Sequence, residues 1–154
     1  MDTIEFANAL IEAERAGALT LTELCDLADR PELRELLRKV AHDEGYWARE
    51  LANVVKRAGG APSSAIGDFA NKVRVIEDLG GKLALLNRGQ MWVVRKIDEQ
   101  LPYVSDREVR GLLSAMAAAH RANIALVDEA LASGLRGKLY QAKTAGFYRK
   151  RESP

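Results

Sequence analysis

The chain has 154 residues, which is enough for one domain to bury its own core without a metal ion or a disulfide. Hydrophobic residues make up 47% of the sequence and charged residues 29%, which is the composition of an ordinary globular protein. The net charge of +1 predicts no overall attraction to a polyanion, and the lone cysteine, Cys25, excludes an intrachain disulfide.

The first residues, Met1-Asp2-Thr3-Ile4-Glu5, resemble a helix cap and lack the order of an export signal. No apolar run approaches the roughly 20 residues that cross a bilayer. We therefore expect a cytoplasmic protein with no membrane partner.

Two amphipathic helices are predicted before the first long loop. Asp2 and Glu5 form a capping pair for a helix over residues 2–28. Pro31 opens a second helix, over residues 31–58, because proline fits the first turn of a helix. The glycine pair at 59–60 ends this helix, and a loop follows to residue 67.

A third helix is predicted over residues 68–101, with Asp68 as its cap and Pro102 as its stop. The pair Gly80-Gly81 could divide it into a crossover helix and a shorter core helix. Because the apolar pattern runs through this pair undisturbed, we expect one long helix.

A fourth helix is predicted over residues 105–133, with Ser105 and Glu108 as its capping pair. No segment of useful length alternates with a period of two, so the predicted fold class is all-α. We divide the chain into a helical bundle over residues 1–134 and a basic C-terminal helix or tail over 135–154.

All four predicted helices carry apolar residues at spacings of three and four, and polar residues interrupt this pattern near the middle of each helix. Positions at these spacings share one helix face, so the interrupting residues should point inward. They form a predicted polar layer in the bundle: Glu14, Glu44, Asn87, Gln90, His120 and Asn123.

Two helical glycines directly neighbour this layer. Gly45 follows Glu44, and Gly89 precedes Gln90. Glycine inside a helix costs about 1 kcal/mol relative to alanine, so a compensating role is expected. Either these glycines allow a close helix approach or a bulge beside the layer, or they only pack as small residues.

Inward carboxylates and a histidine on four helices resemble the ferritin-like superfamily of four-helix bundles. Its di-metal members use a glutamate on each of two helices and a Glu-x-x-His pair on each of the other two. Three segments resemble, more closely, an uncharacterised bacterial family of ferritin-like domains with no known activity: Glu12-Ala-Glu14-Arg-Ala-Gly17, Asp43-Glu44-Gly-Tyr-Trp47 and Asn87-Arg-Gly-Gln-Met-Trp-Val-Val-Arg-Lys96. The resemblance extends over residues 2–132.

Only three of the six ligands in the di-metal pattern are present. Glu14 and Glu44 fit glutamates of the first and second helices, and His120 fits the histidine of the fourth. The remaining positions depart from the pattern: Trp47 replaces a histidine, Gln90 or Asn87 replaces a glutamate, and Ala117 replaces the other glutamate.

Two carboxylates balance one divalent cation, not two, so the sequence argues against a di-iron centre. One alternative is a single Zn²⁺, Mn²⁺ or Fe²⁺ held by Glu14, Glu44 and His120, with water in the remaining positions. The other is a metal-free layer in which Trp47 fills the volume of the lost ligand. The carboxylates are then satisfied by other polar side chains: His120, Asn87, Arg88, Gln90 and Asn123.

Two features concern partners. The run Met91-Trp92-Val93-Val94 covers more than one helix face, and we expect Trp92 to pack on a second copy of the chain in a homodimer. Residues 136–154 hold six basic residues and one acidic residue, interleaved with Tyr140, Phe147 and Tyr148. This tail either lies on the acidic bundle, which we favour, or binds nucleic acid or an acidic partner.

The sequence therefore predicts a ferritin-like bundle with a degenerate di-metal centre, no cofactor, and a non-catalytic structural or regulatory role. The first alternative is a mononuclear metal-binding protein or metal-dependent oxidoreductase that uses Glu14, Glu44 and His120. The second alternative is a binding module that uses its basic tail.

Overall fold

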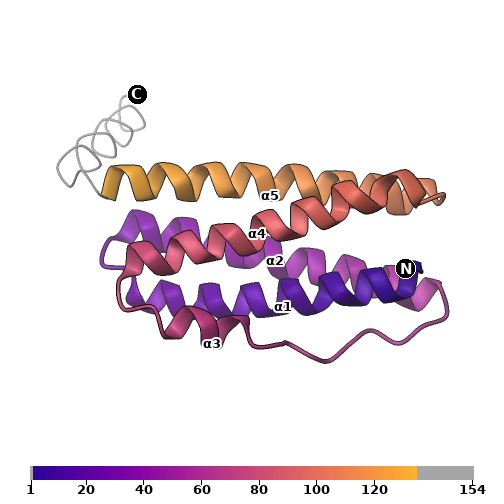
Figure 1. Cartoon of the computed structure of the whole chain (residues 1–154), viewed down its shortest axis with the longest axis horizontal. Helices are drawn as coiled ribbons and strands as arrows, with labels where there is room; N and C mark the ends of the chain where they lie inside the picture. The colour runs from indigo at the N-terminus through magenta and orange to yellow at the C-terminus, as the bar shows by residue number, and fades with distance from the viewer. Residues whose placement is uncertain (1, 135–154) are drawn as a thin grey trace, which may run out of the picture.

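Four long helices and one short helix form the computed structural model of the protein, which describes residues 2–134 (Figure 1). Their bounds are α1 Thr3–Leu27, α2 Pro31–Arg57, α3 Phe69–Arg74, α4 Leu79–Gln100 and α5 Arg107–Gly134, with a 3-10 turn η1 at Leu101–Tyr103. Residues 2–134 contain no strand, and the predicted all-α class is confirmed. Predictions for the basic tail fall on residues 135–154, outside the described residues.

Three of the predicted helix starts can be checked against their caps. The Asp2 carboxylate accepts a hydrogen bond from the backbone N–H of Glu5 at 2.8 Å, and Pro31 is the first residue of α2, as predicted. The prediction that Ser105 caps the last helix was wrong. Asp106 caps α5, because its carboxylate accepts hydrogen bonds from the backbone N–H groups of Glu108 and Val109 at 2.9 and 3.0 Å.

The predicted single helix over residues 68–101 is in fact two helices. The chain leaves α3 after Arg74 and enters α4 with Asp78 as its cap, whose carboxylate accepts a hydrogen bond from the Gly81 N–H at 2.7 Å. A Cβ at Gly81 would lie 2.9 Å from the Asp78 carboxylate, so glycine lets the cap fold back onto the first turn. At the other side of the break, the buried Lys82 ammonium donates to the backbone carbonyls of Val73 and Arg74, both at 3.1 Å.

The helices form two antiparallel pairs joined by one long crossover (Figure 1). α1 packs mainly on α2, and α4 packs mainly on α5. Residues 58–78, which include α3, run back along the bundle before α4 begins, so α4 points in the same direction as α2.

The outer face of α1 holds this crossover in place. The Asn8 amide donates to the Ala61 carbonyl at 3.1 Å and accepts from the Ser63 N–H at 2.8 Å. The Ser63 hydroxyl donates to the Glu12 carboxylate at 2.5 Å, and Arg15 donates to the Ser63 carbonyl at 3.0 Å. These bonds satisfy backbone groups of a loop that has no secondary structure of its own.

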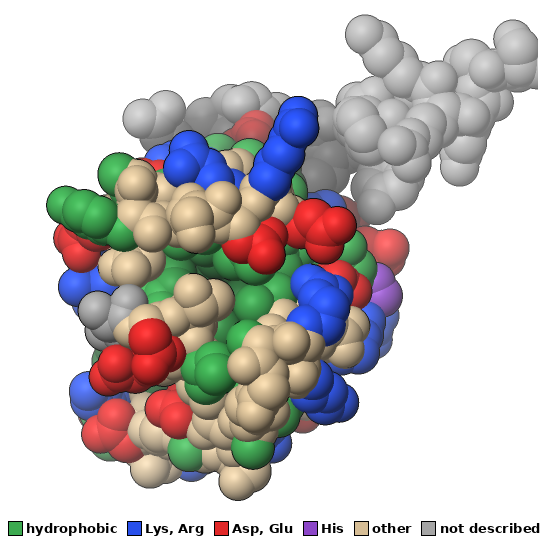
Figure 2. Space-filling view, turned by 90° about the vertical axis from the view of Figure 1, so that its right-hand side faces the viewer, with side chains coloured by type: hydrophobic (Ala, Val, Ile, Leu, Met, Phe, Trp, Pro, Cys, Tyr) green, Lys and Arg blue, Asp and Glu red, His purple; other side chains and the backbone are tan. Residues whose placement is uncertain are grey.

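The apolar core consists of two clusters at opposite ends of the bundle. One includes Leu10, Leu51 and Ile97, and the other includes Leu24, Leu37 and Leu86. At the end where the N-terminus lies, a hollow of about 220 Å³ is lined by apolar side chains together with Asp2, Thr3 and Gln100, and it is visible in Figure 2. Among residues 2–134, no helix combines the length and apolar character needed to cross a membrane.

Candidate metal centre

The six polar residues predicted to point inward are all buried, at 7% exposure or less: Glu14, Glu44, Asn87, Gln90, His120 and Asn123. The helical period therefore placed each of them on the correct face. Their contacts divide five of them into a central group and a peripheral group, and the sixth, Gln90, has no hydrogen-bond partner among the described residues.

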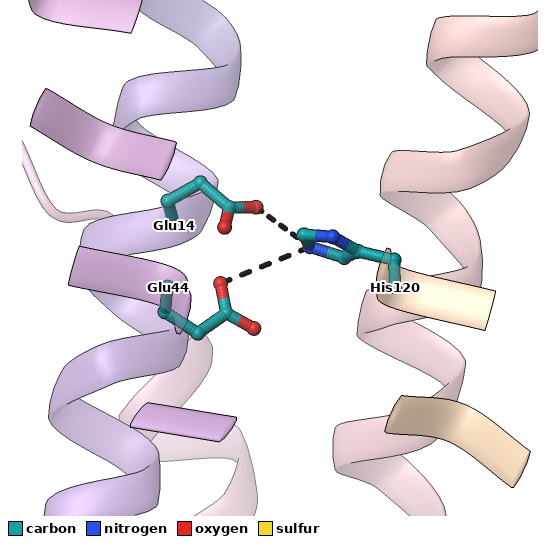
Figure 3. Close-up of side chains that lie close together, drawn as sticks. All are labelled: Glu14, Glu44 and His120. Atoms are coloured by element: carbon teal, nitrogen blue, oxygen red, sulfur yellow. Dashed lines mark hydrogen bonds and ion pairs between the residues drawn. The ribbon is translucent and has the colours of Figure 1, made fainter. Parts of the chain in front are cut away.

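Glu14, Glu44 and His120 form the central group, between the two apolar clusters. Glu14 projects from α1 and Glu44 from α2, and both face His120 of α5 across the bundle (Figure 3). The Nε2 atom of His120 lies 3.0 Å from Oε1 of Glu14 and 3.9 Å from Oε2 of Glu44. One ligand atom from each residue can be chosen such that all three lie within 4.8 Å of one another.

The second ring nitrogen fixes the orientation of the imidazole. Nδ1 of His120 lies 3.0 Å from the backbone carbonyl oxygen of Met116, one helical turn earlier. A carbonyl oxygen only accepts hydrogen bonds, so Nδ1 carries a proton and donates it. Nε2 is therefore the nitrogen turned toward the carboxylates, and a neutral ring offers its lone pair there.

Burial changes the acidity of both carboxyl groups. It raises the pKa of Glu14 from 4.5 to about 7, while the hydrogen bond with Glu44 opposes this rise. Burial also raises the pKa of Glu44 well above its ordinary value, and the neighbouring Glu14 adds to the rise more than the charge of His120 opposes it. Without a cation, the pair therefore holds protons at a pH where exposed glutamates have lost them.

Several buried polar atoms in this layer have no hydrogen-bond partner among the described residues. They are Oε2 of Glu14, Oδ1 of Asn87 and both amide atoms of Gln90. Gln90 is only 4% exposed, and it lines the same cavity as Glu14, Glu44 and His120. Since buried polar groups are ordinarily paired, these atoms leave hydrogen-bonding capacity in the layer that the described residues do not use.

The peripheral group does not complete the layer. The Asn87 amide donates to the Ile124 carbonyl at 3.1 Å and to the Asp128 carboxylate at 2.8 Å. Asn123 accepts from the Lys39 ammonium at 2.8 Å and donates to the Asp43 carboxylate at 2.9 Å. The prediction that these amides could satisfy the two glutamates was therefore wrong, because both turn toward the surface of the neighbouring helix.

Arg88 was also predicted to belong to the polar layer, and this was wrong. It is exposed on α4, because it follows Asn87 by one residue and so lies about 100° around the helix.

Trp47, the predicted plug, is 8% exposed and belongs to the apolar cluster at one side of the layer, with its indole N–H unpaired. Its ring meets the exposed Tyr46 edge-on, with ring centroids 4.8 Å apart. His42, two residues before Glu44, is exposed at the surface.

Of the two alternatives for the glycines beside the layer, simple packing holds for Gly45, and Gly89 makes a close contact with a residue outside the layer. A Cβ at Gly45 would meet only the Arg49 guanidinium, at 3.7 Å, so no close approach requires glycine there. Gly89 instead accommodates the ring of Phe69, which would lie 2.8 Å from a Cβ. The glycine that touches the layer is Gly17, where a Cβ would lie 3.2 Å from the Glu44 carboxyl group.

A cavity of about 540 Å³ lies beside this layer and opens to the surface between α1 and α4. This cavity was not predicted from the sequence, although Gly17 lies in one of the three segments that resemble ferritin-like domains. Cavities depend on how far apart two helices pack, which the pattern along one helix does not record.

Two carboxylates and one imidazole match the ligands that Zn²⁺, Mn²⁺ and Fe²⁺ accept, and three protein ligands leave coordination positions open. A divalent cation would neutralise both glutamates. It would also remove the cost of keeping two ionised carboxyl groups side by side in a buried layer.

A family model described as a domain of unknown function (DUF6306) matches residues 2–129. No curated protein and no solved structure matches the chain significantly.

Proposed function

The chain belongs to the DUF6306 family, and we propose that it binds a single divalent metal ion, Zn²⁺, Mn²⁺ or Fe²⁺, between Glu14, Glu44 and His120. The observation that carries this proposal is the convergence of three buried ligand atoms within 4.8 Å. This choice favours the mononuclear alternative over a metal-free relic, because the Asn87 and Asn123 amides bond elsewhere and Arg88 is exposed. The Gln90 amide lies in the layer but bonds to neither carboxylate.

A further part of the proposal is that the fold is ferritin-like. Two antiparallel helix pairs joined by one long crossover support it, because ferritin-like bundles have a single crossover of this kind. The metal layer at mid-length supports it as well. Replacement of three ligands by Trp47, Gln90 or Asn87, and Ala117 then accounts for one metal ion where relatives of that fold hold two. Aerobic loading with Fe²⁺ should accordingly give fewer than two irons per chain.

Calorimetric titration of chelator-treated protein with Zn²⁺ tests the metal site. We expect one site per chain, which His120→Gln and Glu44→Gln each weaken by more than about 100-fold, since outer-shell partners alone contribute about 10–100-fold. His42→Gln is the matched control, because His42 is the other histidine and is exposed. Equal loss in His42→Gln, or binding that survives His120→Gln, would overturn the proposal.

The remaining predictions on partners stay predictions. Trp92 is 41% exposed, which is compatible with a side chain that a second copy of the chain would cover in a dimer. It also lines the cavity between α1 and α4. The basic tail lies outside the described residues. Neither feature enters the metal proposal.

A further inference from the structure

The cavity beside the metal layer has the size and position of a ligand pocket. Its volume of about 540 Å³ falls within the roughly 300–1,000 Å³ that is usual for small-molecule sites. Its inner end is formed by Glu14, Glu44, Gln90 and His120, and its outer end opens at the surface of α4.

The walls between these two ends are apolar. On α1 they consist of small residues that leave the space unfilled, such as Ala13 and Gly17. On α4 they consist of Leu86 and Val93, and the Phe69 ring of α3 lies against the backbone of Gly89. A molecule in this channel would need an apolar middle section to match these walls.

The outer end carries unpaired positive charge. Arg88 and Arg95 both line the cavity and are exposed, and within residues 2–134 neither forms an ion pair. The other charged groups at this end already have partners. Lys72 pairs with Asp68 at 3.5 Å, and Glu12 accepts a hydrogen bond from Ser63. The mouth therefore favours an anion, and the planar guanidinium group suits a carboxylate.

Polar atoms at the inner end of the cavity lack hydrogen-bond partners. Gln90 is buried with both amide atoms unpaired, and Oε2 of Glu14 is unpaired as well. A ligand that reached this point with an apolar tip would leave these atoms unsatisfied, whereas a hydroxyl or carbonyl oxygen would pair with the Gln90 amide.

We propose that the cavity between α1 and α4 binds a small amphipathic organic acid. Its carboxylate pairs with Arg88 and Arg95 at the mouth, its apolar middle lies along Ala13 and Gly17, and an oxygen at its far end meets Gln90. This inference rests on the proposed metal site in one respect: the far end of the ligand would lie next to Glu14 and His120, two of the proposed metal ligands. The two arginines and the apolar walls are independent of any metal.

Three probes of equal chain length test the proposal: ω-hydroxyoctanoate carries both ends, octanoate lacks the hydroxyl, and octanediol lacks the carboxylate. Shorter and longer homologues are titrated alongside. In calorimetric titrations with chelator present, the hydroxy acid should bind tightest. Arg88→Gln and Arg95→Gln should each weaken both acids by about fivefold, as expected for partly exposed ion pairs, and leave the diol unchanged. Arg107→Gln, an exposed arginine outside the cavity, is the matched control.

Two further variants place the ligand inside the cavity. Gln90→Met should remove the advantage of the hydroxy acid over octanoate, because the amide that meets the hydroxyl is gone. Ala13→Leu should weaken all three probes by narrowing the channel while both arginines remain. Circular dichroism of each variant confirms that it is folded.

The inference would be overturned if the diol bound as tightly as the hydroxy acid, or if Arg107→Gln weakened the acids as much as Arg88→Gln. Repeating the titrations with Zn²⁺ separates the two proposals. Selective acid binding without zinc binding would overturn the metal site alone, and zinc binding without binding of any acid would overturn the ligand pocket alone.

Discussion

Two kinds of buried polar side chain occupy the middle of this bundle, and they differ in whether the protein itself satisfies them. Asn123 bonds to Lys39 and Asp43, and both of its amide atoms have partners. Gln90 is buried to a similar extent, but neither of its amide atoms has a hydrogen-bond partner among the described residues. It lies beside Glu14 and Glu44, whose pKa values are raised by burial.

The difference separates buried polar groups that the fold itself satisfies from those that it leaves unpaired. A paired amide such as that of Asn123 joins α5 to α2 and is complete within the fold. The layer of Glu14, Glu44, Gln90 and His120 is costly to the isolated chain, because unpaired buried polar atoms destabilise the folded state. Substitutions in the two groups should therefore have opposite consequences.

The largest effect expected is on the pH dependence of stability in metal-free protein. Between pH 4.5 and about 7 the unfolded chain loses the Glu14 proton while the folded chain keeps it, so stability falls as the pH rises. Glu14 alone should remove about 3 kcal/mol over this window, and Glu44 acts in the same direction. Urea denaturation at a series of pH values in chelator measures this fall.

Two controls accompany that measurement. The variant with both Glu14→Gln and Glu44→Gln should show little of the fall. Saturating Zn²⁺ should reverse the slope in the wild type, because metal ligands must lose their protons. A metal-free wild type whose stability rises through this window would contradict the account of a buried carboxyl pair.

Smaller changes in stability are expected when either amide is replaced, and the two changes should have opposite signs. Asn123→Leu should destabilise the metal-free protein by about 1–3 kcal/mol, since it leaves Lys39 and Asp43 without their shared partner. Gln90→Met keeps the side-chain volume and removes two unpaired atoms, so it should stabilise the protein by about 1 kcal/mol. Equal losses in the two variants, measured by thermal unfolding, would remove the distinction between the groups.

The smallest effect concerns Trp47, whose indole N–H is also buried and unpaired. Trp47→His places an imidazole three residues after Glu44, on the same helix face, and restores a Glu-x-x-His pair. Zinc affinity should rise about tenfold, or about 1.4 kcal/mol, while metal-free stability falls because a cavity opens. No gain in affinity for a folded Trp47→His variant would mean that this position does not face the metal layer.

The helical period was sufficient to predict which side chains are buried in the middle of the bundle. Glu14, Glu44 and His120 each continue a series of apolar residues at spacings of three and four. Residues at these spacings lie on one face of a helix, and in this bundle that face is buried. The same rule places Arg88 outside, and the prediction that it reaches inward ignored its position one residue from Asn87.

A break near Gly80-Gly81 was the alternative to one long helix, and it was not preferred because the apolar spacing continues across it. The local signal was Asp78, whose carboxylate caps the Gly81 N–H, but an aspartate before two glycines does not by itself outweigh an unbroken pattern. The cavity could not be predicted at all. It depends on the separation of α1 and α4, and the crossover that connects the two helix pairs is held on α1 by contacts distant in sequence, such as Asn8 with Ala61.

Anomalous diffraction at the zinc absorption edge, from crystals grown with Zn²⁺, tests the central claim most directly. The account predicts one strong peak per chain in the middle of the bundle, at about 2.0–2.2 Å from a carboxylate oxygen of Glu14, a carboxylate oxygen of Glu44 and Nε2 of His120. Zinc found only at surface residues such as His42, with the interior layer free of anomalous signal, would contradict it.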